Sequence, residues 1–383
     1  MTVWTQTQTE SPATQALLET LPIPRGLSDE VASLTAVESR VRQSVSALRT
    51  EWQAVSPPKE RDLGGLDPDC VVDLLEMVVD SGGKRLRPRM THWGWVAAAG
   101  ARTGCGREDM ITIAAALELL HAFALVHDDV MDEADSRRGR PSVHAVASGQ
   151  HRGSGGRGAG PRYGESIAIL VGDLLHSEAD ALAAQVPVAL RAAWRTMSIE
   201  LISGQTRDLV GAANGRRDLT HARQVARAKS GAYTVWRPLQ FGAIAAGASA
   251  ETLAALQRFG EQLGEAFALR DDLLGVLGDP ARTGKPVGDD LIAGKPTVLL
   301  ALAEQRFGPT ARLAMRRAGN GCSPEQAAYL TAELVRCGVV DEVEQLIRDA
   351  VLCGERALDH PAIEPEAALG LRQLAHRVAW RNA

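Results

Sequence analysis

Two aspartate-rich segments, far apart in the chain, follow stretches of apolar residues. The first is Asp128-Asp129-Val130-Met131-Asp132, and the second is Asp271-Asp272-Leu273-Leu274-Gly275, followed by Asp279. A carboxylate in apolar surroundings is costly, and it takes up a proton unless a positive charge lies beside it. Mg²⁺ prefers carboxylate and phosphate oxygens and keeps several of its waters. The two segments therefore predict a Mg²⁺ site that a phosphorylated substrate completes.

The first aspartates are expected on one face of a helix. Residues 117–127 contain neither Gly nor Pro and continue directly into Asp128, which indicates one long, mostly buried helix. Asp128 and Asp132 would lie one turn apart, about 6 Å along the axis, close enough to share divalent cations. Residues 267–274 have the same character, so two carboxylate clusters would face each other across a cavity. Taken alone, either motif also fits a chance acidic run at a solvated helix end.

Four basic segments accompany the acidic ones. They are Gly82-Gly83-Lys84-Arg85-Leu86-Arg87-Pro88, Arg137-Arg138-Gly139-Arg140-Pro141, Lys229-Ser230, and the run from Thr283 to Asp290 that leads to Lys295. Arg offers a planar fork for diphosphate oxygens and Lys a point charge, so several of each predict a site for two diphosphates. A single basic run is usually only a solvated face. The net charge of -5 lacks the basic excess of a nucleic-acid-binding surface, so no nucleic-acid partner is expected.

The order of these motifs resembles the trans-isoprenyl diphosphate synthases, most closely the bacterial geranylgeranyl diphosphate synthases. The resemblance covers roughly residues 40 to 380 through GGKRLRP, DDxxD, RRGRP, KS, DDxxG and TGKPVGDDL. It implies that an allylic diphosphate is held by Mg²⁺ ions between the two acidic clusters, beside isopentenyl diphosphate. It also implies an isoprenoid synthase-type helical bundle around a central cavity, and a homodimer.

The resemblance also implies roles for individual residues. The direct metal ligands match Asp128, Asp132 and Asp271, and positions that act through metal-bound water match Asp129, Asp272 and Asp279. The residues that hold the diphosphate of isopentenyl diphosphate match Lys84, Arg87, His121 and Arg138. The clamp on the allylic diphosphate matches Arg137, Lys229 and Lys295, with Lys285 added, and the polar groups along the carbocation match Ser230 and Gln205.

The implied reaction is a head-to-tail condensation. Metal and clamp neutralise negative charge as the C–O bond of the allylic diphosphate breaks, and the double bond of isopentenyl diphosphate attacks the resulting carbocation. The released diphosphate is a plausible base for the final proton loss, so no dedicated His or Glu is required. His127 adjoins Asp128, but its ring is expected to point off the metal face because adjacent helical residues do not share a face.

Phe123 predicts the length of the product. It lies five positions before Asp128, about 7.5 Å along the helix, and Ala124 beside it is small. In the resembling family, one aromatic at this lower position without an insertion in DDxxD accompanies a geranylgeranyl product. The alternative for Phe123 is ordinary core packing, because apolar residues at helical spacing are the usual interior.

The sequence is also compatible with other functions. They are a synthase of another chain length, farnesyl or longer, and a regulatory non-catalytic subunit, which Ala268 and Gly275 favour as departures from the family pattern. A terpene cyclase would not need the second diphosphate site.

The fold class expected from the sequence is all-α. Ala- and Leu-rich segments with helical period follow one another, whereas alternating Val, Ile and Thr are scarce. We expect one domain over residues 31–383, a disordered extension over residues 1–30, and a flexible Gly-rich insertion near residues 150–162. The insertion matches GxGxxG by letter, but no strand precedes it, so dinucleotide binding is not expected.

The cysteines, the N-terminal residues and the apolar runs bear on the cellular location of the chain. The five cysteines show no CxxC spacing, which favours reduced thiols and a cytoplasmic location. The N-terminal residues resemble neither a signal peptide nor an anchor. No run of eighteen apolar residues occurs, so stable membrane insertion is not expected.

Overall fold

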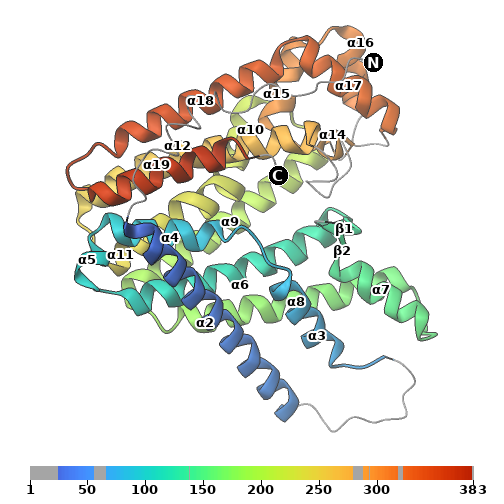
Figure 1. The fold of residues 1–383 in the computed structure, drawn as a ribbon. Helices are drawn as coiled ribbons and strands as arrows, with labels where there is room; N and C mark the ends of the chain where they lie inside the picture. Colours follow the sequence, from blue (N-terminus) through green and yellow to red (C-terminus); the bar gives the residue numbers. More distant parts are fainter. Residues whose placement is uncertain are drawn as a thin grey trace.

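Helices make up nearly all of the chain that the computed structural model describes, namely residues 25–55, 66–137, 139–278, 288–292, 294–317 and 322–381 (Figure 1). The all-α prediction is confirmed. The helices are α2 (Arg25–Val55), α3 (Cys70–Asp80), α4 (Leu86–Ala97), α5 (Gly100–Thr103), α6 (Arg107–Met131), α7 (Val143–Gly153), α8 (Gly160–Ala183), α9 (Val188–Ala213), α10 (Leu219–Val225), the π-helix η1 (Ala226–Trp236), α11 (Arg237–Ala245), α12 (Ala250–Leu277), α14 (Asp289–Ile292), α15 (Val298–Arg306), α16 (Pro309–Arg317), α17 (Pro324–Arg336), α18 (Val339–Ala357) and α19 (Pro365–Ala379).

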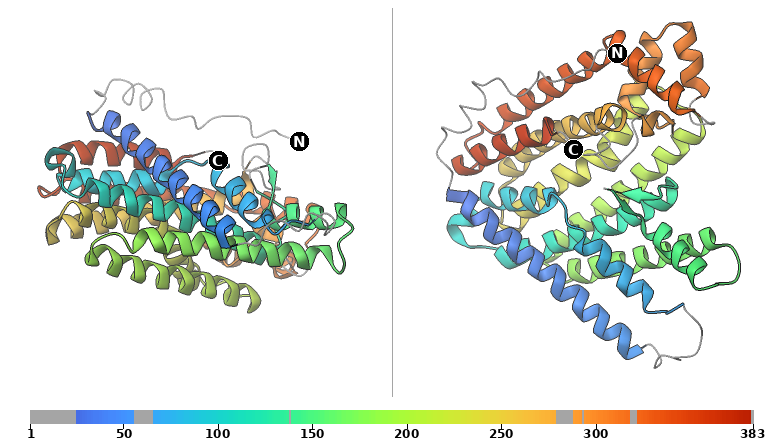
Figure 2. Two further views of the ribbon diagram at one scale, coloured as in Figure 1. Left: turned by 90° about the horizontal axis from the view of Figure 1, so that it is seen from below. Right: turned by 45° about the vertical axis from the view of Figure 1, so that its right-hand side comes forward.

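Strand structure in the described residues is a short antiparallel hairpin. Strands β1 (Ser136–Arg137) and β2 (Arg140–Pro141) pair just after α6, with Arg137 opposite Arg140. Helices α15, α16 and α17 gather at one end of the molecule, and α2 and α9 lie on opposite sides of it (Figure 2). The hairpin therefore places Arg137 close to the end of α6.

The apolar helix α6 lies at the centre of the fold. Its residues 113–117 are fully buried, and the helix contacts α2, α4, α8 and α11. A helix that is apolar on every side requires such surroundings. Among the described residues, only α6 is long and apolar enough to cross a bilayer, but 67% of its most apolar window is buried inside the protein. Core packing therefore accounts for its composition.

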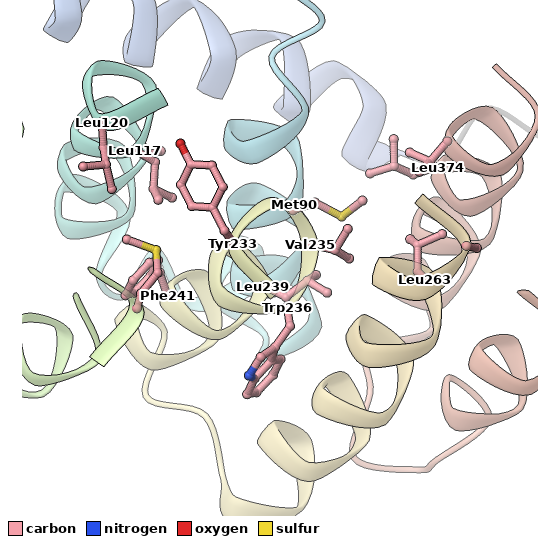
Figure 3. Packing of buried hydrophobic residues seen from close by; sticks show 14 of the residues in the cluster. Met90, Leu117, Leu120, Tyr233, Val235, Trp236, Leu239, Phe241, Leu263 and Leu374 are labelled. Carbon is pink, nitrogen blue, oxygen red and sulfur yellow. The ribbon is translucent and has the colours of Figure 1, made fainter. Parts of the chain in front are cut away.

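A second bundle forms around α12, which contacts η1 and α18. Figure 3 shows Tyr233 projecting from η1 beside Leu117 of α6, with Met90 of α4 and Leu263 of α12 nearby. Ser249 begins α12 by accepting the amide hydrogen of Thr252 at 3.1 Å, a typical helix N-cap. The two acid-bearing helices, α6 and α12, are thus joined through η1 and α11 in one apolar core.

Two expected boundaries change in the structure. Helix α2 begins at Arg25, and Glu30 is buried and accepts hydrogen bonds from Trp93 Nε1 at 3.0 Å and Arg89 at 2.9 Å. Residues 25–30 therefore belong to the helical domain, and residues 1–24 lie outside the described residues. The Gly-rich insertion is also shorter than predicted, since α7 extends to Gly153 and α8 begins at Gly160, where Pro161 suits the first helical turn.

Candidate active site

The first acidic motif lies at the carboxyl end of α6, as predicted. Lys229 Nζ lies 3.1 Å from Asp128 Oδ1, and Lys295 Nζ lies 2.7 Å from Asp132 Oδ2. Arg137 Nη2 lies 3.5 Å from the other Asp128 oxygen. The hairpin, η1 and the segment before α15 each deliver one of these basic residues. Three of the residues predicted for the allylic diphosphate therefore converge on the two acids predicted to bind metal.

Opposing effects set the ionisation of this cluster. Burial disfavours the charged form of Asp128, but the charges of Lys229, Lys295 and Arg137 outweigh it and lower the pKa of Asp128 below its ordinary value. Burial likewise disfavours the ammonium of Lys229, yet Asp128 and Asp208 raise the pKa of Lys229. Both groups are therefore charged at neutral pH.

Asp129 is the least exposed acid of the first motif. It is buried, and Arg137 Nε donates to its Oδ1 at 2.7 Å. Burial raises the pKa of Asp129 although Arg137 opposes the shift. Its contact holds Arg137 beside Asp128.

The second acidic motif lies near the carboxyl end of α12, and its two aspartates have different partners. Asp271 Oδ1 accepts a hydrogen bond from Arg381 Nη2, whereas Asp272 Oδ2 accepts the amide hydrogen of Val298 at 3.0 Å. Asp272 therefore anchors the start of α15. This start lies three residues after Lys295 in the chain. Arg138, Asp279 and Lys285, which the sequence also assigned to the site, lie outside the described residues.

The donor set fits Mg²⁺ held jointly by protein and diphosphate. Among the described residues, no three His, Cys, Asp or Glu side chains form a group that could enclose a metal ion. Each predicted direct ligand nevertheless faces a basic side chain: Asp128 faces Lys229, Asp132 faces Lys295 and Asp271 faces Arg381. All three acids therefore lie where a positive charge is favoured. A metal ion bound by so few carboxylates would keep coordination positions for phosphate oxygens and water.

Two of the residues predicted for a second diphosphate meet at Tyr233. Arg87 is buried, its guanidinium carbon lies 4.1 Å from the Tyr233 ring centre, and its Nη2 donates to Thr234 Oγ1 at 2.9 Å. The His121 ring lies 6.4 Å from the same ring. Lys84 is exposed in the loop before α4. Burial raises the pKa of Tyr233 to about 12, so its phenol is neutral.

Arg85, in the same motif, takes the left-handed conformation with φ of 50°. This conformation is uncommon for a residue with a side chain. Arg85 Nη1 donates to Glu118 at 2.6 Å and its Nε to Glu38 at 3.3 Å. These ion pairs hold the Gly82–Arg87 turn against α6 and α2 and so position Arg87.

Comparison with known proteins identifies the family. Residues 68–332 match the family model described as polyprenyl synthetase. The chain belongs to this family. It is 34% identical over 304 residues to a geranylgeranyl diphosphate synthase of Mycobacterium tuberculosis, covering 78% of this chain and 80% of that protein. It is 32% identical over 320 residues to a geranylfarnesyl diphosphate synthase of Aeropyrum pernix, covering 80% and 92%.

A solved structure agrees with this assignment. The crystal structure of a geranylgeranyl pyrophosphate synthase from Corynebacterium glutamicum, complexed with isoprenyl diphosphate and magnesium, is 39% identical and aligns with a TM-score of 0.83. The alignment covers 90% of this chain and 97% of that chain. The predicted family and fold are confirmed, and the chain is a prenyltransferase of the trans-prenyl diphosphate synthase type.

In this polyprenyl synthetase, Phe123 contacts a residue that the sequence did not single out. Its ring centre lies 4.7 Å from that of His176 on α8 and 4.6 Å from that of His127. His127 Nε2 lies 3.2 Å from the carbonyl oxygen of Ile169, so this ring faces α8. No sequence motif surrounds His176. Its position beside Phe123 follows only from the packing of α6 against α8.

Of the two polar residues predicted along the carbocation, Gln205 lies close to Asp128. Gln205 Nε2 is 3.4 Å from Asp128 Oδ1, and Ser230 follows Lys229 in η1. No role was predicted for Asp208, whose Oδ2 accepts a hydrogen bond from Lys229 Nζ at 2.6 Å. Asp208 lies one turn after Gly204-Gln205 on α9. This helical spacing is the sequence feature that could have indicated its place beside the site.

Proposed function

We propose that this chain catalyses the Mg²⁺-dependent head-to-tail condensation of isopentenyl diphosphate with an allylic diphosphate, giving geranylgeranyl diphosphate. The observation that carries the proposal is the convergence of Lys229, Lys295 and Arg137 on Asp128 and Asp132. Acids held beside several cations suit a highly charged diphosphate, which brings negative charge to the cations and oxygen ligands to the metal.

The proposed roles follow from charge and position. Asp128, Asp132 and Asp271 would hold Mg²⁺, which supplies Lewis-acid stabilisation of the leaving diphosphate. Lys229 and Lys295 bind diphosphate oxygens and stabilise the charge that develops there as the C–O bond breaks. Both side chains are only 20% exposed, so their charges are weakly screened. Gln205 orients its amide beside Asp128.

The Arg87 site supports elongation over cyclisation. A cyclase acts on one diphosphate, whereas Arg87, His121 and Lys84 offer a second basic site apart from the first acidic motif. Arg87 is fixed by Thr234 and by the face of Tyr233, so its fork is oriented before a substrate arrives. In this proposal, these residues bind isopentenyl diphosphate.

The relatives' names cover more than one chain length, so the product is inferred from residues of this chain. Phe123 lies on α6 below Asp128 and is backed by His176 of α8. The two rings join neighbouring helices and would close the space into which a growing prenyl tail extends. They form the floor in our proposal of a geranylgeranyl product.

A homodimer is part of the same proposal. Large apolar side chains on the neighbouring helices α8 and α9 are about half exposed, among them Ile169, Leu170, Ile199 and Ile202. Such clusters mark protein interfaces. Light scattering should give a dimer mass for the native chain, and Ile202→Glu should shift it toward a monomer.

The test incubates the purified chain with Mg²⁺, isopentenyl diphosphate and, separately, dimethylallyl, geranyl or farnesyl diphosphate, followed by chromatography of the dephosphorylated products. Geranylgeraniol supports the proposal, and farnesol or longer alcohols overturn the chain length alone. Asp128→Asn should abolish turnover, while Asp109→Asn, at the other end of α6, should not. Failure to elongate any starter would refute the activity and favour a non-catalytic subunit.

A further inference from the structure

Lys229 has two carboxylate partners, and only one belongs to the predicted metal site. Its Nζ lies 2.6 Å from Asp208 Oδ2 and 3.1 Å from Asp128 Oδ1. Asp208 projects from α9 and its side chain is 13% exposed. The partner outside the DDxxD motif is therefore both nearer to the ammonium and well shielded from water.

Binding of a divalent cation changes the balance between these two partners. Once Asp128 shares its oxygens with a metal ion, the like charges of the ion and the ammonium repel, and the attraction of Asp128 for Lys229 falls. Asp208 remains as the acid that still attracts the ammonium. Without it, the long Lys side chain would lose its fixed position and turn toward solvent.

The backbone of α9 lies directly against η1 at this point. A Cβ placed on Gly204 would lie 2.7 Å from the Lys229 amide nitrogen, so only glycine allows this approach. Asp208 follows Gly204 by four residues and so lies on the same face of α9. One helix thus supplies both the close backbone contact and the charge that aims the side chain.

We propose that Asp208 is the positioning residue of Lys229: it holds the ammonium at the allylic diphosphate while Asp128 carries a metal ion. The inference rests on the proposed function. Asp208 touches neither substrate nor metal in this assignment, and its influence on the reaction passes through Lys229. Its loss should weaken the binding of the allylic diphosphate and leave that of isopentenyl diphosphate unchanged.

A double-mutant cycle separates this role from a general effect on folding. The Asp208→Asn, Lys229→Ala and doubly substituted proteins are compared with the native chain for kcat and for both KM values. Loss of a hydrogen bond between charged groups should raise KM for the allylic diphosphate about tenfold in Asp208→Asn. The double variant should resemble Lys229→Ala alone, because Asp208 then has no ammonium left to position. Asp208→Glu should restore part of the loss.

A matched control lies on the same helix. Glu200 pairs with Arg237, whose Nε donates at 2.8 Å, so Glu200→Gln also removes a charge from a helix-to-helix ion pair. It should leave both KM values unchanged. Calorimetric titration with inorganic diphosphate and Mg²⁺ adds a readout without turnover, in which Asp208→Asn should bind more weakly than Glu200→Gln.

The outcomes distinguish this inference from the proposed function. An inactive native chain contradicts the function itself. An active native chain in which the two substitutions have additive effects, or in which Asp208→Asn raises both KM values equally, overturns the positioning role. Thermal unfolding identifies a variant that fails to fold. If Asp208→Asn fails to fold, the kinetic comparison is made with Asp208→Glu instead.

Discussion

Replacing Arg381 with Ala should strengthen metal binding by the substrate-free chain. Arg381 binds Asp271, its Nη2 also donates to the carbonyl oxygen of Phe267 at 3.3 Å, and its guanidinium carbon lies 4.2 Å from the Phe267 ring centre. A divalent cation that uses Asp271 must first break this ion pair. The guanidinium therefore competes with metal for the carboxylate.

The expected change in metal affinity follows from the solvent exposure of the Asp271–Arg381 ion pair. The Asp271 side chain is 52% exposed and that of Arg381 is 11% exposed, so the ion pair is partly screened and contributes about 0.5 to 1 kcal/mol. Removing the competitor should tighten metal binding by the same free energy, about two- to fivefold. Loss of the ion pair and of the cation–π contact should also lower the free energy of unfolding by about 1 to 2 kcal/mol. Metal affinity and stability thus change in opposite directions.

Calorimetric titration of the substrate-free protein with Mg²⁺ measures the affinity, and urea unfolding without metal measures the stability. Arg377 is the matched control, because it is exposed in the last turn of α19. Arg377→Ala should change neither quantity, and Arg381→Lys, which keeps the charge, should give an intermediate affinity. Equal or weaker Mg²⁺ binding by Arg381→Ala would show that Arg381 supports Asp271 and does not compete with the metal.

Three further predictions concern other parts of the site. Phe123→Ala, and to a smaller extent His176→Ala, should lengthen the product, and chromatography that shows an unchanged profile would assign Phe123 to core packing alone. Gly204→Ala should destabilise the fold by about 1 to 3 kcal/mol through overpacking against η1 and raise KM for the allylic diphosphate, as unfolding curves and kinetics can show. Burial raises the pKa of Tyr233 from 10.0 to about 12, so the unfolded phenol loses its proton first and the folded chain should lose up to about 3 kcal/mol of stability as the pH rises through that interval. Urea unfolding should show a smaller alkaline loss for Tyr233→Phe, and an unchanged loss would refute this assignment.

The helices that carry the acids were predictable from local sequence. The apolar stretch before Asp128 has no helix breaker, and α6 continues through it to Met131. The basic residues were identified by type and motif, but their partners were not. Lys229 is 101 residues away from Asp128 in the chain, and their meeting depends on how η1 packs between α9 and α12. No local pattern contains that information.

Residues outside the motifs were harder to predict from the sequence. Asp208 had a weak signal, its helical spacing from Gly204 and Gln205, whereas Arg381 and His176 had none. Arg381 reaches Asp271 because α19 packs against α12, where Arg270 Nε donates to the carbonyl oxygen of Ala379 at 2.6 Å. The end of the predicted N-terminal extension was also missed, because Glu30 is buried only through its contacts with Trp93 and Arg89.

The paired aspartates show why position along a helix matters as much as residue type. Adjacent helical residues point about 100° apart, so two neighbouring carboxylates cannot serve one metal face equally. In each motif, the first acid faces a cation at the site, Lys229 for Asp128 and Arg381 for Asp271. The second acid binds the backbone or side chain of a segment that delivers a basic residue. Asp129 holds Arg137, and Asp272 accepts the amide hydrogen of Val298 at the start of α15, just beyond Lys295. The double aspartate therefore combines a site for positive charge with an anchor for the clamp around it.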